Sequence, residues 1–463
     1  MNKITQEDIA FLRKTVAPNG KVSIGDEINE KYCHDEMGAL YHAPDVLVEP
    51  TGAEQISAIM RYANERLLPV TPRGQGTGLV GASVAIQGGI LLSTARMNHI
   101  LELDEENLTL TVEPGVVLMD IAKYVDARDF LYPPDPGEKS ASIGGNINTN
   151  AGGMRAVKYG VTRDYVRGLE VVLPSGEIIR LGGKVAKNSS GYSLKDLIIG
   201  SEGTLGFVTK AVLRLLPKPR VSLSLLVPFD DLATAIKTVP VIIRSKYIPT
   251  AIEYMEKPVL FEAERYLGKK FPDHSSDAYL LLTFDGNTRD EVDVAYSKVA
   301  DVCLANGARD VLISDTEERQ SSIWTARGAF LEAIKASTTE MEECDVVVPK
   351  NCVADFVLYE KEVERIARLR LAGFGHAGDG NIHIYLLRDD LPKEEFKKRM
   401  EHAFLLLYGK AKEMGGHVSG EHGIGYAKRP YLADSLGETQ LLLMRAIKKV
   451  FDPNGILNPG KIC

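Results

Sequence analysis

Cysteine is scarce and scattered in this sequence. The five cysteines are Cys33, Cys303, Cys344, Cys352 and Cys463, and no two of them are spaced as C-x-x-C. Disulfide frameworks and iron–sulfur clusters need closely grouped thiols, so neither is expected. We predict reduced, structural cysteines, and electrons from any redox reaction would have to leave this chain by another route.

Long apolar runs and an excess of positive charge are also missing. No segment approaches the roughly 18 to 20 apolar residues of a membrane-spanning helix. With 55 Lys and Arg against 63 Asp and Glu, the net charge is −8, which offers no basic face to nucleic acid or anionic lipid. We therefore expect no nucleic acid partner and no direct membrane span.

The opening residues lack the pattern of a secretory signal. Glu7 and Asp8 stand where such a signal carries its apolar core. The alternation of charged and apolar residues over 1–16 predicts a helix instead, and we expect a cytoplasmic protein.

A chain of 463 residues, 44% of them hydrophobic, is too long for one core, so two domains are expected. Apolar residues recur at helical spacing over 118–125. Leu216-Pro217-Lys218-Pro219 cannot continue a helix or a central strand and predicts the domain boundary. Before this boundary, β-rich runs bounded by glycine predict strands over 90–93, 108–113, 169–173 and 208–216.

Beyond the boundary, strands alternate with longer helices. Strands are predicted over 222–227 and 279–284, and helices over 289–305 and 318–336. This pattern indicates a sheet covered by helices. The turn-rich stretch 451–460 is predicted to run across a surface as an ordered segment.

Glycine is concentrated in one loop after residue 72. Gly74, Gly76, Gly78 and Gly81 fall within eight residues, and such a loop exposes backbone N–H groups to a pyrophosphate. The last three form G-x-G-x-x-G, but a Rossmann site needs a long helix directly afterwards. Residues 82–89 are too short and too rich in glycine for that helix, which disfavours the Rossmann interpretation. Taken alone, the loop is also compatible with a structural turn.

Three further segments of the same kind follow, at 142–153, 187–192 and 200–206. All are rich in glycine and in hydroxyl or amide side chains. Four such loops in one half of the chain indicate a single long, polar ligand enclosed by backbone groups.

These loops, together with Pro133-Pro134-Asp135-Pro136, resemble the FAD-binding domain of the vanillyl-alcohol-oxidase superfamily. The resemblance implies FAD, with residues 73–78 as its pyrophosphate-binding turn. Relatives that hold FAD covalently carry a histidine or cysteine near the position of Thr77 or in a later loop. These loops have neither, so we expect noncovalent FAD. The implied FAD contacts are Arg73, Gly74, Gln75, Gly76, Thr77, Gly78, Ser142, Gly144, Gly145, Asn148, Gly152, Gly153, Glu202, Gly203 and Val208.

Only nine histidines are present, and three of them lie in two short motifs, Gly375–His383 and Ser419–Gly425. Turn residues in the first motif let the chain fold back, so that His376 and His383 point at one centre. Glu421 would add an anionic ligand. Two imidazoles and a carboxylate suit Zn²⁺ with an open position or Fe²⁺ in a facial triad.

His422 is the candidate base, because an imidazole titrates near neutral pH and this one follows Glu421 directly. A bound divalent ion would lower the pKa of a substrate hydroxyl, so that a modest base can take its proton. The alternative, in which His422 only supports the site and Glu421 acts alone, stays open at this point.

Both motifs, with Phe451–Lys461, resemble the C-terminal domain of FAD-linked oxidases. This group includes the glycolate oxidase catalytic subunit, D-lactate dehydrogenase and D-2-hydroxyglutarate dehydrogenase. The resemblance spans about residues 42 to 461. It implies His376, His383 and Glu421 as metal ligands, His422 as the base and Asn458 near the flavin.

Trp324–Arg327 resembles the family segment whose arginine grips the substrate carboxylate, a task that suits the planar guanidinium. The alternative for Arg327 is an exposed arginine on a helix. Relatives that act on five-carbon diacids carry extra polar or cationic groups after this arginine, where this chain has Leu331 and Glu343. A distal carboxylate is thus disfavoured, and the substrates expected are D-lactate first and glycolate second.

The implied fold class is α+β: a two-subdomain FAD-binding domain of the vanillyl-alcohol-oxidase type plus an α+β cap domain with an antiparallel sheet. The implied domains are an N-terminal helical extension (1–41), the FAD-binding domain (42–219), the substrate or cap domain (220–440) and a C-terminal segment that returns to the FAD domain (441–463).

The expected reaction is oxidation of the hydroxy acid to its 2-oxo acid, with metal-assisted deprotonation and hydride transfer to flavin N5. Electrons would leave through an electron-transferring flavoprotein or an iron–sulfur subunit. One rival function is a noncatalytic FAD-binding relay subunit, and another is an FAD enzyme acting on a sugar, lactone or alcohol. Neither needs His376, His383 and Glu421, so this set favours the dehydrogenase.

Overall fold

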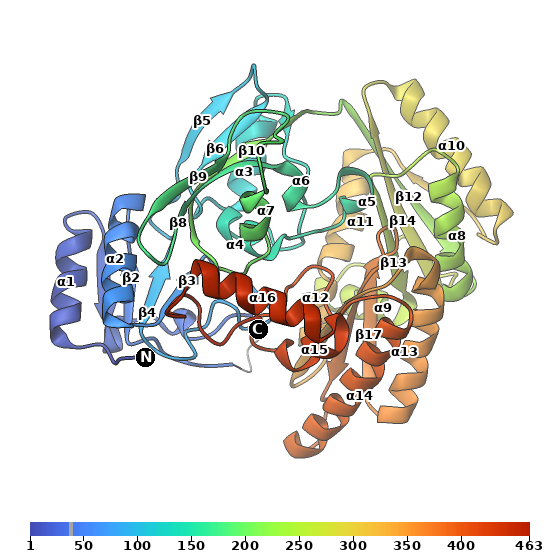
Figure 1. The fold of residues 1–463 in the computed structure, drawn as a ribbon. Helices are drawn as coiled ribbons and strands as arrows, with labels where there is room; N and C mark the ends of the chain where they lie inside the picture. Colours follow the sequence, from blue (N-terminus) through green and yellow to red (C-terminus); the bar gives the residue numbers. More distant parts are fainter. Residues whose placement is uncertain (37–39) are drawn as a thin grey trace. The chain divides into compact units, whose positions relative to one another are not determined.

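The computed structural model describes residues 1–36 and 40–463, which form two compact units (Figure 1). The first unit comprises Met1–Ala151, Val161–Lys218 and His422–Cys463, and the second comprises Gly152–Gly160 and Pro219–Glu421. The chain therefore changes unit next to the predicted boundary at 219 and again directly after Glu421.

One sheet of the first unit is mainly parallel. Its strand order is β1-β2-β4-β3, with β2, β4 and β3 parallel and β1 antiparallel to β2. The strands are β1 (Lys21–Ile24), β2 (Val46–Glu49), β3 (Val70–Arg73) and β4 (Ile90–Ser93). Helices α1 (Gln6–Val16) and α2 (Ala53–Arg66) pack against each other in this unit.

Helix α2 was not predicted, although its sequence carries the signal. Ile56, Ile59, Met60 and Ala63 follow helical spacing and are completely buried. They join the core cluster that includes Val46, Val70 and Ile90 from the sheet, so the helix covers one sheet face.

The second sheet of the first unit is antiparallel, in the order β5-β6-β10-β8-β9. Its strands are β5 (Ile100–Asp104), β6 (Thr109–Val112), β8 (Val166–Val172), β9 (Ile178–Gly182) and β10 (Phe207–Arg214). The short strands β7 (Phe130–Leu131) and β11 (Leu216–Pro217) pair with each other. The helices of this part are α3 (Leu118–Asp126), α4 (Ile143–Thr149), α6 (Thr162–Tyr165) and α7 (Leu194–Ile198). Two sheets in one unit give the two-subdomain arrangement.

The C-terminal part of the first unit contains α15 (Arg429–Leu436) and α16 (Glu438–Phe451), followed by a segment beside β3. The Val70 N–H donates to the Ile456 carbonyl at 2.8 Å, and the Asn458 N–H donates to the Val70 carbonyl at 2.7 Å. Ile456 and Leu457 are completely buried. The prediction of a surface segment was wrong here, because these apolar side chains complete the core beside β3.

The second unit is built on a seven-stranded antiparallel sheet, in the order β15-β12-β14-β13-β17-β18-β16. Its strands are β12 (Val221–Phe229), β13 (Ala251–Glu256), β14 (Ala278–Gly286), β15 (Leu312–Ser314), β16 (Met341–Val347), β17 (Arg370–His376) and β18 (Asn381–Leu387). The sheet confirms the predicted strands over 222–227 and 279–284.

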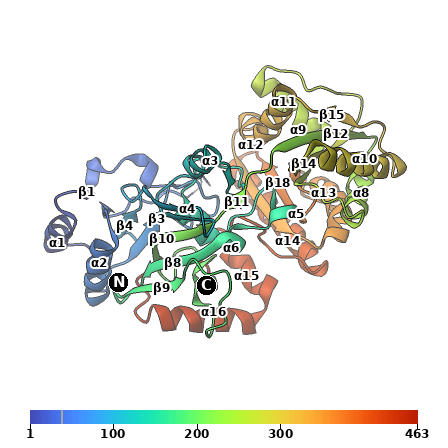
Figure 2. The ribbon, with the colours of Figure 1, turned by 90° about the horizontal axis from the view of Figure 1, so that it is seen from above.

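Helices cover both faces of this sheet (Figure 2). On one face lie α9 (Lys257–Leu267), α11 (Glu317–Gly328) and α12 (Phe330–Ala336), and on the other lie α8 (Leu232–Arg244), α10 (Arg289–Ala305) and α13 (Val353–Ala367). The unit also contains α5 (Ala156–Tyr159) and α14 (Lys393–Glu413). Within the described ranges 1–36 and 40–463, no helix is both long enough and apolar enough to cross a bilayer.

The helix predicted over 318–336 is two helices. Helix α11 ends at Gly328 and α12 begins at Phe330. Glycine weakens a helix interior because it gains no side-chain contacts and loses much backbone freedom. Gly328 therefore marks the break that helical periodicity alone does not reveal.

Candidate functional site

The strand register of the second unit gathers polar side chains on one sheet face. Glu253 on β13 stands opposite His376 on β17, and Asp345 on β16 stands opposite His383 on β18. His376 is in turn paired with Asn381 on β18. Because directly paired residues of antiparallel strands share a face, these five side chains project from the same side of the sheet.

The hairpin of β17 and β18 brings the two predicted histidine ligands together. The His376 and His383 rings are almost perpendicular, with centroids 5.3 Å apart. Glu421 places Oε1 3.4 Å from His376 Nε2 and Oε2 3.9 Å from His383 Nε2. One donor atom from each of the three lies within 4.8 Å of the others. This donor set fits a divalent ion, with two imidazoles and one carboxylate.

Two glycines contact the Glu421 carboxylate. The Gly153 N–H donates to Glu421 Oε1 at 2.7 Å. A Cβ at Gly152 would lie 2.6 Å from the same oxygen, so a larger residue there would displace the Glu421 carboxylate. Both glycines were predicted as FAD contacts. In the second unit they position Glu421, and an FAD contact stays a prediction.

Asp345 fixes the backbone that carries Glu421. This completely buried carboxylate accepts from Asn381 Nδ2 at 2.6 Å, from Ser419 Oγ at 2.8 Å and from the Gly420 N–H at 3.1 Å. The Glu421 N–H also donates to it, at 3.3 Å. Asp345 was missed in the sequence, where the signal is an acidic residue beside the apolar run Val346–Val348.

Arg327 is buried, with 6% of its surface exposed, so the alternative of an exposed helix arginine was wrong. Its Nε and Nη2 donate to Glu253 Oε2 at 2.9 and 2.5 Å. The guanidinium carbon lies 4.5 Å from the centroid of the Phe374 ring. Its predicted contact with a substrate carboxylate stays a prediction.

Glu253 is a second residue that the sequence analysis missed. It is completely buried, and its Oε1 lies 2.6 Å from His376 Nδ1. Burial acts to raise the pKa of Glu253, but His376 and Arg327 together hold it below its ordinary value. Burial acts to lower the pKa of His376, but the carboxylates of Glu253 and Glu421 raise it well above the ordinary value. Glu253 therefore carries a negative charge behind His376.

His422 begins the last segment of the first unit, and its role as the base stays a prediction. The loop that follows is held by Glu202, which accepts the N–H groups of Ile424 and Gly425, each at 2.7 Å. A Cβ at Gly423 would lie 2.7 Å from Glu202 Oε1. Burial raises the pKa of Glu202 to about 7.

The glycine-rich loop after β3 is braced from beneath by two buried cations. Arg73 Nη2 donates to the Lys31 carbonyl at 2.5 Å, and a Cβ at Gly76 would meet this nitrogen at 2.0 Å. Lys461 Nζ donates to the carbonyls of Gly81 and Val84 at 2.7 and 2.6 Å. The Gly81 N–H donates to Asp35 at 2.8 Å, and the two cations place positive charge beside the loop, which favours an anionic ligand. Arg73 was predicted as an FAD contact, which stays a prediction.

The cradle around this loop fits an anionic ligand. Gly74 packs so closely on Ser142 that a Cβ would lie 2.1 Å from its Oγ, and Gly76 has a φ of +81°. Both positions therefore require glycine, the residue type that lets a loop expose its backbone N–H groups to an anion. Between Gly81 and β4 the structure has turns and no helix, in agreement with the rejected Rossmann interpretation.

Hydrogen bonds join the other predicted FAD loops in the first unit. Asn148 Nδ2 donates to the Gly144 carbonyl at 2.7 Å, and Asn148 Oδ1 accepts the Gly203 N–H at 3.0 Å. Asn458 Nδ2 donates to the Glu202 carbonyl at 2.7 Å. Ser142 caps α4 by accepting from the Gly145 N–H, and Val208 is buried in β10. The remaining predicted contacts of the first loop are Gln75, Thr77 and Gly78. By contrast, the predicted segment 187–192 is exposed along its whole length.

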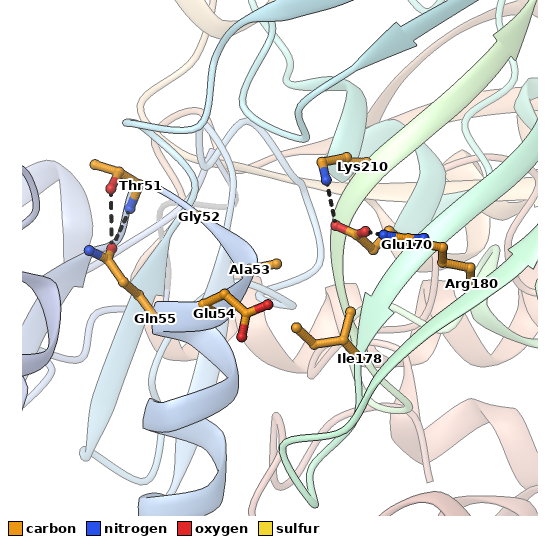
Figure 3. A pocket seen from close by; sticks show the side chains of 9 residues that line it. All are labelled: Thr51, Gly52, Ala53, Glu54, Gln55, Glu170, Ile178, Arg180 and Lys210. Atoms are coloured by element: carbon orange, nitrogen blue, oxygen red, sulfur yellow. Dashed lines mark hydrogen bonds and ion pairs between the residues drawn. The ribbon is translucent and has the colours of Figure 1, made fainter.

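A surface cavity of about 740 Å³ lies elsewhere in the first unit, between the start of α2 and strands β8 to β10 (Figure 3). Glu170 in this cavity pairs with Arg180 at 3.3 Å and with Lys210 at 3.0 Å, so these charges compensate one another. The lining is Thr51, Gly52, Ala53, Glu54, Gln55, Glu170, Ile178, Arg180 and Lys210. None of these is a predicted site residue.

Known protein families match both parts of the chain. The C-terminal domain of FAD linked oxidases matches residues 218–462, and an FAD binding domain matches residues 44–182. A D-lactate dehydrogenase of Anaerostipes hadrus is 50% identical over 100% of this chain and 98% of its own length. The glycolate oxidase subunit GlcD of Bacillus subtilis (strain 168) is 42% identical over 93% of this chain and 91% of its own length.

A solved structure shares the fold. The crystal structure of p-cresol methylhydroxylase with substrate bound superposes with a TM-score of 0.81 at 21% identity, over 99% of this chain and 97% of that chain. The predicted fold class is thereby confirmed as an FAD-binding fold of the vanillyl-alcohol-oxidase type with an antiparallel cap sheet. The chain belongs to the FAD-linked oxidase family and is an FAD-dependent oxidoreductase.

Proposed function

We propose that this enzyme oxidises a small D-2-hydroxy acid to its 2-oxo acid, with D-lactate as the first substrate and glycolate as the second. The observation that carries the proposal is the His376, His383 and Glu421 cluster, whose histidine His376 is paired in the sheet with Glu253, the partner of the buried Arg327. The names of the D-lactate dehydrogenase and glycolate oxidase relatives support the substrate class.

Two bound groups would complete the site. FAD, held noncovalently by the loops of the first unit, supplies the hydride acceptor at flavin N5. A Zn²⁺ or Fe²⁺ ion held by His376, His383 and Glu421 supplies a positive charge that lowers the pKa of the substrate hydroxyl.

The side chains of this enzyme then bind the acid and move its proton. Arg327 orients the substrate carboxylate, and the side of its guanidinium that Glu253 does not use offers a fork for two parallel hydrogen bonds. His422 takes the hydroxyl proton, since a neutral imidazole is a competent base near pH 7. The apolar Leu331 gives no partner to a second carboxylate, which favours small monoacids.

The electrons leave through a partner protein in the cytoplasm. The scattered cysteines supply no iron–sulfur cluster, so an electron-transferring flavoprotein or an iron–sulfur subunit is needed as acceptor. The flavoprotein is preferred, and a stable complex formed with an iron–sulfur subunit alone would overturn that preference.

Anaerobic reduction of the flavin tests the proposal. The purified holoprotein is mixed in turn with D-lactate, L-lactate, glycolate and D-2-hydroxyglutarate, with and without a chelator, and the flavin absorbance is followed. Rapid bleaching by D-lactate that the chelator suppresses is expected, with slower bleaching by glycolate. If protein that holds both FAD and metal is bleached by none of these acids, the proposed function is wrong and the relay subunit gains support.

The attachment of FAD is tested on the same protein. Acid precipitation should release the yellow colour into the supernatant. A colourless supernatant with a yellow pellet would show a covalent link instead.

A further inference from the structure

We infer that Glu253 is a positioning residue that sets both the metal ligand His376 and the carboxylate-binding Arg327. The inference rests on the proposed function and adds a residue that links its metal site to its substrate-carboxylate site. Glu253 acts through these two neighbours, to which both of its carboxylate oxygens are bonded.

The fold places Glu253 between these neighbours. It lies in the middle of β13, directly opposite His376 of β17 in the strand register. Oε1 faces His376 Nδ1 at 2.6 Å, while Oε2 accepts from both Nε and Nη2 of Arg327. Each carboxylate oxygen is thus committed to one partner.

The first consequence concerns the tautomer of His376. A carboxylate only accepts, so Nδ1 carries a hydrogen, and Nε2 is the nitrogen that can exchange its proton for a cation. Nε2 is the nitrogen that faces Glu421 Oε1, at 3.4 Å. A carboxylate behind a ligating histidine fixes the ring orientation and raises the ligand's basicity. Glu253 therefore prepares His376 to bind a cation through Nε2.

The second consequence concerns the orientation of Arg327. Glu253 occupies the side of the guanidinium formed by Nε and Nη2, and it does not use the side formed by Nη1 and Nη2. The Phe374 and Phe330 rings lie 4.5 and 5.5 Å from the guanidinium carbon and restrict its rotation. A second carboxylate would meet the Nη1–Nη2 side, which matches a 2-hydroxy acid bound by metal and arginine together.

Three variants test this role. Glu253→Gln keeps the shape but presents an amide N–H to one of the two donors. Glu253→Asp keeps the charge but shortens the side chain, so one carboxylate cannot reach both partners. Removing the charge alone leaves Arg327 as a buried cation without its partner, which threatens folding. The double variant Glu253→Gln/Arg327→Met removes both charges and keeps the test possible in a folded protein.

Glu256→Gln is the matched control. Glu256 lies on the same strand and is also buried, and its Oε2 pairs with Lys361 at 3.0 Å. Its position three residues after Glu253 places it on the opposite face of β13. The same chemical change is thus made on one strand without touching the cluster.

The measurements are Zn²⁺ affinity by competition with a chelating dye, the visible spectrum of the Co²⁺-loaded protein, FAD content and KM for D-lactate. We expect Zn²⁺ binding to weaken by about 10- to 100-fold in all three Glu253 variants. The Co²⁺ spectrum should change, KM should rise about 10-fold or more in the single variants, and FAD content should stay at the wild-type level. Glu256→Gln should match the wild type in all four.

Two results would overturn the inference in distinguishable ways. If Glu253→Gln and the double variant both bind Zn²⁺ within about twofold of the wild type, with an unchanged Co²⁺ spectrum, Glu253 does not position His376 and the proposed function still stands. If the wild-type protein binds neither Zn²⁺ nor Co²⁺, the metal site of the proposed function fails and the inference fails with it.

Discussion

The glycine loop of the first unit is braced by two cations and by Asp35, which accepts the Gly81 N–H at 2.8 Å, whereas the His–Glu cluster of the second unit is braced by carboxylates. Arg73 and Lys461 donate to backbone carbonyls beneath the loop, whereas Glu253 and Asp345 accept N–H groups around the cluster. Cations bonded to carbonyls beside a loop favour an anionic ligand there, and carboxylates bonded to imidazoles favour a cation.

The comparison predicts that a substitution in the His–Glu cluster leaves FAD binding by the glycine loop unchanged. His376→Ala should lower turnover of D-lactate by at least about 10²- to 10³-fold, the scale known for loss of one preorganised electrostatic group. FAD content should stay stoichiometric, because the predicted FAD loops, Gly152 and Gly153 excepted, belong to the other unit. Turnover and bound FAD are measured on the same preparation.

The control for this variant is His402→Ala, an exposed histidine on α14 of the same unit. It should keep turnover within about twofold of the wild type. Loss of FAD together with turnover in His376→Ala would show that the two regions are not independent and would remove the basis of the comparison.

A smaller effect is expected from the anionic brace Asp345. Asp345→Asn keeps the size but replaces one acceptor oxygen by a donor, which opposes the N–H groups of Gly420 and Glu421. Zn²⁺ affinity should fall by about 10- to 100-fold, as for other groups behind metal ligands. Asp389→Asn, which breaks an ion pair with Arg370 near the surface, is the control. Equal Zn²⁺ affinity in both variants would refute a bracing role for Asp345.

The groups that would contact ligands could be proposed from the sequence, but their braces could not. His376 and His383 share one hairpin motif, and the glycine loops are contiguous, so local spacing is enough to find them. Glu253 lies 123 residues from His376 and 74 from Arg327. The strand order β13-β17 makes Glu253 and His376 neighbours, and the packing of α11 in the same unit adds Arg327. A single sequence gives neither strand register nor helix packing.

For some residues the sequence predicted a ligand contact, whereas the structure shows them holding other parts of the protein. Arg73 was predicted as an FAD contact because it adjoins the glycine loop, yet its Nη atoms donate to the carbonyls of Lys31 and Ser83. Gly152 and Gly153 were assigned to the same ligand because they continue a glycine-rich run. Their closeness to Glu421 depends on a contact across 268 residues of chain. Local composition identifies a loop, but only the fold identifies what each residue of it faces.

Glu202 is, like Asp35, an anionic brace within the first unit. Its folded-state pKa of about 7 exceeds the ordinary value of 4.5 because of burial. Between these two pH values the folded state binds the extra proton, so this carboxyl lowers the free energy of unfolding as the pH rises. The slope for one group is at most about 1.4 kcal/mol per pH unit.

Glu202→Gln should remove that contribution and flatten the fall in the free energy of unfolding between pH 5 and pH 7. Urea unfolding of the holoprotein at pH 5, 6 and 7 measures the slope, and Glu106→Gln, at an exposed site of the same unit, should keep the wild-type slope. A Glu202→Gln slope equal to that of the wild type would mean that Glu202 does not take up a proton in this range. Glu202 would then be a permanent anion, as Glu253 is, and both units would contain anionic braces. The two units would then differ in the group that each brace holds and not in the charge of the brace.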